Sequence, residues 1–238
     1  MIVYRPLVLL AAIAALAGCT NAPQSNGSGG DSTFSDAGTN VTHAVNGSIH
    51  VAAGQQTDEV STVNGSIHVD ANAKLTAGHT VNGSIQLGAH AAADELNTVN
   101  GGITLDDGVH VARAVNTVNG GLTLRNGADV SGTLVNVNGR IELKAAHVGG
   151  GIRTVNADID VGSNSRVEGG ITVSKSDSPF SFFGWGGRKP KIVIGPGAVV
   201  QGPLRFERDV DLYVSDRATI GPVTGATPQK FSGEAPPS

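Results

Sequence analysis

A heptapeptide that begins with Val-Asn recurs along the chain at a spacing too short for a helix-based repeat, and this spacing limits the folds available. The copies run from VNGSIHV at 45–51 to VNADIDV at 155–161. Their Asn residues lie 18 or 19 positions apart and are Asn46, Asn64, Asn82, Asn100, Asn119, Asn138 and Asn156. A fixed short period is typical of a chain built from stacked units that each contact only their neighbours.

Apolar and polar residues alternate inside each unit, as in a strand with one buried face. The third and fifth positions after the Asn are Ile, Leu or Val, as in Ile49 and Val51, and a polar residue such as His50 lies between them. Weaker apolar pairs recur before and after this segment. Each unit is therefore predicted to contain three short strands.

Three strands and three corners in 18–19 residues predict an all-β fold, a single-stranded parallel β-solenoid with three sides and preferably a right-handed coil. Neighbouring coils would pair about 4.8 Å apart, with Val, Ile and Leu stacked inside. The Asn-Gly pair fits a corner because both residues tolerate positive φ, and the seven Asn side chains are expected to form an amide ladder. Asn-Gly is also typical of hairpins, so an antiparallel meander is the structural alternative.

Residues 1–18 have the pattern of a secretory signal peptide, with Arg5 before an apolar stretch at 7–17 that is too short to span a bilayer. The stretch ends in LAGC at 16–19, which resembles the lipobox of bacterial lipoproteins. The resemblance implies cleavage before Cys19 and attachment of lipid, including palmitate, to that residue. Thr20 in place of Asp resembles the pattern for outer-membrane sorting. An ordinary secretory signal followed by a chance Cys is the alternative.

The remaining composition divides the chain into three parts. Residues 19–40 are predicted to be a lipidated Cys and a flexible polar tether, residues 41–223 the solenoid, and residues 224–238 a disordered tail. The net charge of −4 and the lack of a basic patch argue against a nucleic-acid partner.

An aromatic segment at 174–191 interrupts the period, and EGGITV at 168–173 just before it resembles a further copy of the heptapeptide. The segment is predicted to be a protruding loop that carries Phe180, Phe182, Phe183 and Trp185, after which about two coils close the solenoid. It is either a flap that covers the exposed edges of the core or a contact loop for a membrane or a partner.

The polar residues predict little chemistry. His50 and His68 share one outward row, but a dedicated metal site takes three or four ligands, so no metal and no cofactor are expected. The carboxylates are dispersed rather than clustered, which argues against an enzyme. A Thr recurs two positions before the Asn and is expected to face outward; these residues are Thr62, Thr80, Thr98 and Thr117.

The VNGSI-type repeats at about 41–173 resemble the DUF4097 family of adhesin-like bacterial proteins. The closing segment IVIGPGAVVQGPL at 192–204 resembles the polymer-forming solenoids of the bactofilin type. These resemblances imply a β-solenoid at the cell surface or in the envelope and supply no catalytic residues.

The sequence thus predicts a non-enzymatic lipoprotein of the bacterial outer membrane, a lipid-tethered solenoid that acts as an adhesin-like binding or scaffolding module. Its expected partners are the membrane, through the N-terminal lipid, and an envelope or surface component or a second copy of the chain. The alternative is a carbohydrate-binding or carbohydrate-cleaving β-helix protein of the cell envelope.

Overall fold

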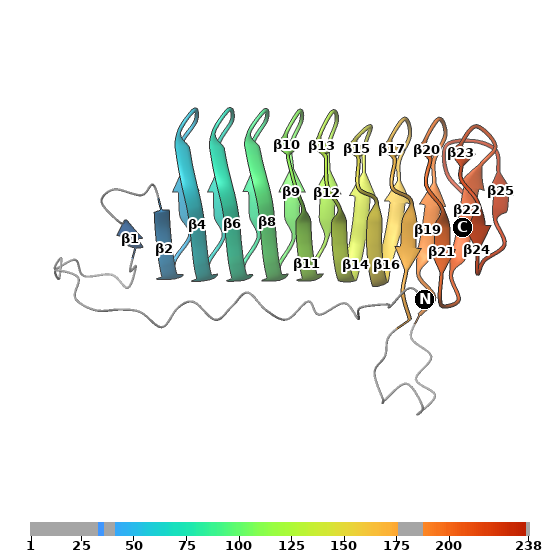
Figure 1. Cartoon of the computed structure of the whole chain (residues 1–238), viewed down its shortest axis with the longest axis horizontal. Coiled ribbons are helices and arrows are strands. Elements are labelled where there is room, and N and C mark those ends of the chain that lie inside the picture. The colour runs from blue at the N-terminus through green and yellow to red at the C-terminus, as the bar shows by residue number, and fades with distance from the viewer. Residues whose placement is uncertain (1–32, 36–40, 176–187, 237–238) are drawn as a thin grey trace, which may run out of the picture. The chain divides into compact units, whose positions relative to one another are not determined.

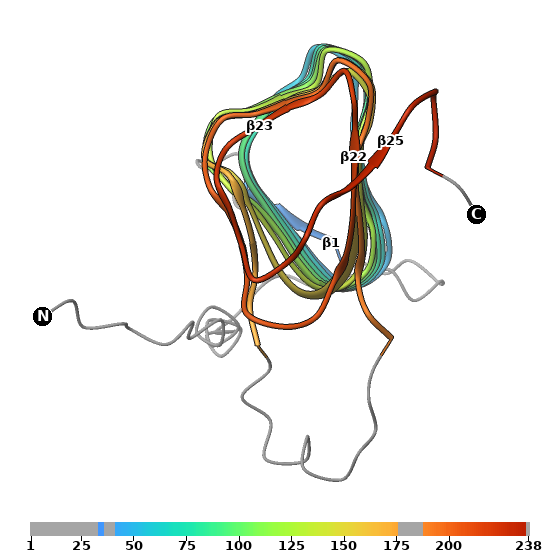
Figure 2. The ribbon, with the colours of Figure 1, turned by 90° about the vertical axis from the view of Figure 1, so that its right-hand side faces the viewer.

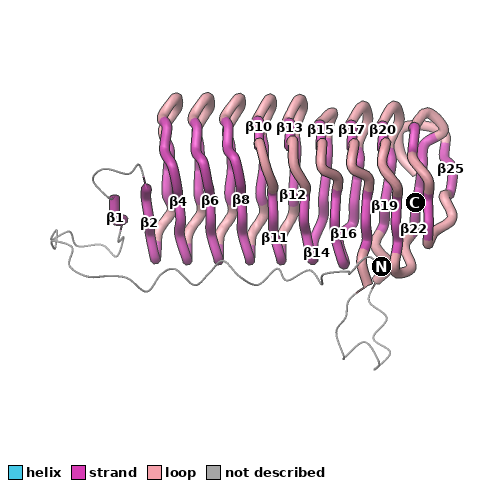
Figure 3. The backbone as a smooth tube through the Cα atoms, viewed as in Figure 1, coloured by secondary structure: helices cyan, strands magenta, loops and turns pink. Residues whose placement is uncertain are grey.

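The computed structural model describes residues 33–35, 41–175 and 188–236. Every regular element in these ranges is a β-strand (Figure 3). The strands stack into a β-solenoid of about ten turns (Figure 1). The predicted parallel solenoid is therefore confirmed, and the antiparallel meander is wrong, because all coil-to-coil pairings from β2 onward are parallel.

Each coil has three sides, and the strands on each side form a parallel face. The first face leads into the Asn corner and contains β2 (Val41–Asn46), β4 (Gln56–Asn64), β6 (Lys74–Asn82), β8 (Ala92–Asn100), β11 (Val115–Asn119), the first halves of β14 (Leu134–Leu143) and β16 (Ile152–Val161), β18 (Ile171–Val173), β21 (Leu204–Phe206) and β24 (Val223–Thr224).

The second face follows the corner and contains β3 (Ile49–Val51), β5 (Ile67–Val69), β7 (Ile85–Leu87), β9 (Ile103–Leu105), β12 (Leu122–Leu124), the second halves of β14 and β16, β19 (Lys191–Ile194), β22 (Asp211–Ser215) and β25 (Gln229–Phe231). The third face contains the first residues of β4, β6 and β8, then β10 (His110–Val111), β13 (Asp129–Val130), β15 (His147–Val148), β17 (Arg166–Val167), β20 (Val199–Val200) and β23 (Thr219–Ile220).

The coil is right-handed. Seen from its C-terminal end, the last coil runs from β22 across to β23 and back to β25, anticlockwise as the chain advances toward the viewer (Figure 2). At the opposite end β1 (Thr33–Ser35) pairs antiparallel with β2, inside the range predicted to be tether.

Columns of identical side chains fill the interior, because the coils pair without any slip in register. Ile67, Ile85 and Ile103 pair in sequence along the second face and are each at most 1% exposed. Full burial of such a side chain contributes about 1.5–3 kcal/mol. This repeated burial is why a chain with such a short period has a continuous core.

The recurrent Thr residues face inward, so the expectation that they face outward is wrong. Strand residues alternate between faces, and the residue four positions before the Asn is buried, as Val60 shows. Two residues later Thr62 is therefore inside and 2% exposed, while the Val before the Asn faces outward, Val45 being 40% exposed. Each inward hydroxyl donates a hydrogen bond to the corner Gly carbonyl of the preceding coil, at 2.9 Å from Thr62 to Gly47.

The corner Gly is required mainly for close approach; of the six corner glycines only Gly47 and Gly139 have the predicted positive φ, at 150° and 140°. A Cβ on Gly65 would lie 1.9 Å from the Gly47 carbonyl oxygen, and the same contact recurs at the next coils. None of the seven ladder Asn residues has a positive φ. Left-handed residues instead form a column at the corner between the second and third faces, namely Gly54, Asn72, His90, Gly108, Gly127, Ala145, Asn164 and Gly197.

The aromatic segment leaves the solenoid at the place where earlier coils have the Asn corner. Ile171 pairs with Ile152, so 171–173 continues the first face and 168–173 is not another copy of the heptapeptide. The chain returns on the second face, where Ile192 pairs with Ile159. Residues 176–187 between them lie outside the described range.

The C-terminal region is more ordered than predicted. The disordered tail was expected to begin at 224, but β25 pairs in parallel with β22 and places Ser215 opposite Phe231. Phe231 is 5% exposed, which explains why this segment stays on the body of the solenoid.

Candidate functional site

The second face presents one continuous outward row of side chains, here called the outer row. Its members pair coil by coil and are His50, His68, Gln86, Thr104, Thr123, Glu142, Asp160, Val193 and Tyr213. The row begins with two imidazoles and reaches carboxylates farther along. Each end of this row carries a cluster of polar groups.

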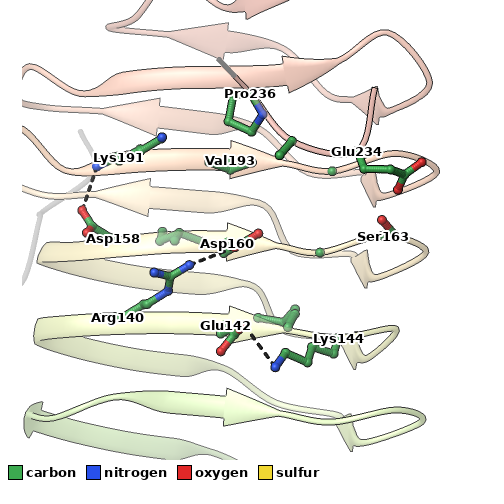
Figure 4. Close-up of a pocket in the computed structure, with 15 residues that line it drawn as sticks. Arg140, Glu142, Lys144, Asp158, Asp160, Ser163, Lys191, Val193, Glu234 and Pro236 are labelled. Atoms are coloured by element: carbon green, nitrogen blue, oxygen red, sulfur yellow. Dashed lines mark hydrogen bonds and ion pairs between the residues drawn. The ribbon is translucent and has the colours of Figure 1, made fainter. Parts of the chain in front are cut away.

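A groove of about 540 Å³ lies at the carboxylate end, between the second face and the C-terminal segment at 234–236 (Figure 4). Its floor consists of β14, β16 and β19, and Pro236 and Glu234 lie along one wall. The sequence does not predict this groove, because the C-terminal residues that form its wall lie in the range predicted to be a disordered tail.

The carboxylates of the groove are each held by a cation or a backbone amide. Arg140 Nη2 lies 3.0 Å from Asp160 Oδ2, and Lys144 Nζ lies 3.2 Å from Glu142 Oε1. Asp158 accepts a hydrogen bond of 2.9 Å from the backbone amide of Lys191 and pairs with Arg188. The groove therefore offers both charges and hydrogen-bonding groups to a ligand.

A cluster of two imidazoles and one carboxylate lies at the other end of the outer row. His50 Nε2 is 2.9 Å from Asp70 Oδ2, and His68 Nε2 is 3.2 Å from Asp70 Oδ1. The two rings lie 5.5 Å apart between centroids and are tilted by 39°. The hydrogen bond from His50 lowers the pKa of the Asp70 carboxyl, which favours its ionised form.

A second His–Asp cluster lies on the third face. His110 Nδ1 is 2.7 Å from Asp129 Oδ2, and His147 Nδ1 contacts the other oxygen of the same carboxylate. Partial burial alone would raise the pKa of Asp129, but the hydrogen bonds with His147 and His110 outweigh it and the pKa is lowered. Glu168 lies 3.4 Å from His147 Nε2 and has a pKa lowered mainly by its hydrogen bond with Arg166.

The seven Asn residues lie in one column along the corner, joined by six amide-to-amide hydrogen bonds of 2.9–3.0 Å. Each Nδ2 donates to the Oδ1 of the Asn one coil earlier. The side chains are exposed to solvent, so water competes for these bonds. Arg208 lies at the end of the ladder, where its guanidinium donates to Asn156 Oδ1 and, at 3.2 Å, to the Val155 carbonyl.

Two groups of predicted site residues lie outside the described range. Cys19, the predicted lipid attachment point, is one of them. The others are the aromatic residues of the interrupting segment, Phe180, Phe182, Phe183 and Trp185.

Sequence reasoning also missed two polar residues. Asp70 lies two positions after His68 and so points to the same side of the strand, which the alternation could have revealed. Arg208 had no such signal, because its partner Asn156 lies 52 residues earlier.

No helix in the described ranges has the length and apolar character needed to cross a membrane.

Comparison with known proteins identifies no relative of this chain. No protein-family model matches the chain, and neither the curated proteins nor the solved structures include a significant match.

Proposed function

We propose that the protein is a non-enzymatic lipoprotein of the bacterial outer membrane, attached through lipid on Cys19, whose solenoid acts as an adhesin-like binding or scaffolding module. One observation carries the proposal: the exterior consists of in-register rows of side chains that continue over about ten coils. Side chains of one row lie about 4.8 Å apart, and the Asn ladder repeats the same group at this spacing over seven coils. Such a surface suits a polymeric or repetitive partner, which can occupy many equivalent positions at once.

The bonding between coils supports a rigid module. Backbone ladders join neighbouring coils on three faces, and at the corner the Asn side-chain ladder and the hydrogen bonds from Thr hydroxyls to Gly carbonyls add to them. Each coil contacts only its neighbours, so the surface offered to a partner is a long and regular one. Rigidity lowers the conformational entropy lost on binding.

The polar chemistry supports binding rather than catalysis. Glycoside cleavage takes two carboxyl groups of which one is held protonated. In the groove, Glu142 and Asp160 each pair with a cation instead. Paired charges at the surface are suited to recognition of a ligand by hydrogen bonds and charge.

The tether completes the proposed arrangement. A Gly- and Ser-rich chain of about 20 residues has a root-mean-square span of roughly 25 Å. Residues 19–40 have this composition. A lipid on Cys19 would then hold the solenoid close to the membrane while leaving its faces free to meet a partner.

Site-specific photo-crosslinking in living bacteria tests the binding or scaffolding role. A photoreactive amino acid is placed at Thr123 on the second face, Asn116 on the first face and Ala112 after the third-face strand β10. The proposal predicts a discrete adduct from at least one position, with an envelope component or a second copy of the chain. Absence of any adduct from all three positions, with the protein present at normal level, contradicts it.

The groove in Figure 4 favours carbohydrate binding as the second candidate function, since it combines cations, carboxylates and a volume of about 540 Å³. Binding of the protein to an array of envelope glycans tests this candidate. Arg140→Ala removes a groove cation and is predicted to abolish any groove-dependent signal. Arg113→Ala, on an exposed side chain near the third face, is the control. Equal glycan binding by both variants would rule out the groove as the carbohydrate-binding site.

A further inference from the structure

We propose that His50, His68 and Asp70 form a binding site for a divalent transition-metal ion of the Zn²⁺ class, with His50 Nε2, His68 Nε2 and one Asp70 carboxylate oxygen as ligands. The ligand atoms of these three residues all lie within 4.8 Å of one another. No other group of three His, Cys, Asp or Glu side chains in the described ranges meets this condition. None of the three residues lines the groove.

The fold itself sets the positions of the three groups. His50 and His68 pair across β3 and β5, so their side chains leave the same face one coil apart. Asp70 follows His68 by two residues and, by strand alternation, lies on the same side. All three groups are thus carried by the rigid ladder of two neighbouring coils, which fixes the site before a metal arrives.

The spacing of the ligand atoms is compatible with a shared metal ion. Zn²⁺ binds His nitrogen at about 2.0–2.1 Å and carboxylate oxygen at about 2.0–2.2 Å, so neighbouring ligand atoms of a tetrahedral site lie about 3.3 Å apart. His50 Nε2 lies 2.9 Å from Asp70 Oδ2 and His68 Nε2 lies 3.2 Å from Asp70 Oδ1, and the ligand atoms all lie within 4.8 Å of one another. Small rotations of the imidazoles would therefore open the space that the ion occupies.

The exposure of the cluster suits an ion that keeps water. The side chains of His50, His68 and Asp70 are 60%, 49% and 34% exposed. Three protein ligands with one position left for water are a common arrangement for Zn²⁺. The ion binds neutral imidazoles and an ionised carboxylate, so any proton on the two Nε2 atoms leaves to solvent as the metal enters.

The third-face cluster serves as an internal control. There His110 and His147 lie two coils apart, with Asp129 between them. As in the proposed site, each imidazole contacts a different oxygen of one carboxylate. Here, however, the two imidazoles belong to coils on opposite sides of Asp129, and among the described residues the ligand atoms of this cluster do not gather within 4.8 Å of one another.

Co²⁺ titration of the full chain, purified without a polyhistidine tag, tests the proposal through the visible d–d absorption of the bound ion. We expect saturation at one equivalent and displacement by Zn²⁺. His68→Gln and Asp70→Asn should each weaken the affinity at least tenfold, whereas His110→Gln and His147→Gln should leave it unchanged. Lack of saturable binding, or equal losses in both sets of variants, overturns the proposal.

Nuclear magnetic resonance of the unaltered protein gives a second test that does not depend on variants that fold. Substoichiometric Co²⁺ should broaden the imidazole signals of His50 and His68 first. Broadening that begins at His110 or His147, or that affects all imidazoles equally, contradicts the proposed site.

Discussion

Arg208 ends the amide ladder by donating a hydrogen bond to Asn156, its partner 52 residues earlier in the chain. The same guanidinium donates to the Val155 carbonyl at 3.2 Å. The interrupting segment takes the place of the next Asn corner. The following coil therefore has no Asn whose Nδ2 could donate a hydrogen bond to Asn156 Oδ1. Arg208 supplies that missing donor and connects the closing coils to the regular repeats.

Arg208→Met is therefore predicted to lower the free energy of unfolding by about 1 kcal/mol, less than the roughly 1.5–3 kcal/mol typical of hydrogen bonds to a charged group, because solvent competes at this corner. Chemical denaturation measures the change. Arg205→Met, on an exposed side chain of β21, is the control and should change stability by less than about 0.5 kcal/mol. Equal stability of the two variants would mean that the hydrogen bonds from Arg208 to the end of the Asn ladder contribute nothing.

The inward hydroxyls give a second prediction. Thr98 is 4% exposed and donates to the Gly83 carbonyl at 3.0 Å. Thr98→Val keeps the shape but leaves that carbonyl without this donor, so a loss of about 1–2 kcal/mol is expected in chemical denaturation. Thr104→Val, in the outer row, should stay within about 0.5 kcal/mol. A stabilising effect of Thr98→Val would show that the internal hydrogen bond is dispensable.

Close approach at the Asn corner gives a third prediction. A Cβ on Gly101 would lie 2.0 Å from the Gly83 carbonyl oxygen, so Gly101→Ala must separate two coils and should cost about 3 kcal/mol. Gly54 has φ of 71° but open space around it. Gly54→Ala should cost only about 1 kcal/mol, from left-handed backbone strain. Thermal unfolding of both variants measures the two losses of stability. A larger loss for Gly54→Ala than for Gly101→Ala would refute the steric explanation.

The third-face cluster predicts an acid dependence of stability. Because the folded-state pKa of Asp129 is lowered, its ionised form stabilises the fold above the unfolded pKa of about 3.9. This stabilisation is lost as the pH falls through the lower, folded-state pKa. Asp129→Asn should therefore reduce the melting temperature at pH 6 and have little effect at pH 2. A constant difference at both pH values would show that the carboxylate charge is irrelevant.

Much of the fold could be predicted from the sequence, because an 18–19-residue period admits few architectures and Ile and Val at fixed positions define the core. It is harder to predict which residues of each strand face the core. The alternation of inward and outward residues is interrupted at the Asn corner. As a result, the Val before the Asn faces out and Thr62 faces in, although hydrophobicity alone suggests the reverse. The Gly requirement was assigned to φ because the contact with Gly47 comes from the neighbouring coil.

The candidate sites depended more on three-dimensional information. His50 and His68 were placed together from the repeat, but Asp70 joins them through its position beside the second strand. The groove needs the C-terminal segment to fold back beside β19. The only sequence signal that this Pro-rich, polar tail folds back onto the solenoid is Phe231, an apolar residue that the structure shows to be buried.

Mass spectrometry of the N-terminal peptide, from protein extracted out of bacterial membranes, tests the proposed lipid-tethered module most directly. The account predicts that the mature chain begins at Cys19 and carries lipid there, and that Cys19→Ser releases a folded solenoid from the membrane fraction. An unlipidated Cys19 in membrane-bound protein, or unchanged membrane attachment of Cys19→Ser, would contradict it.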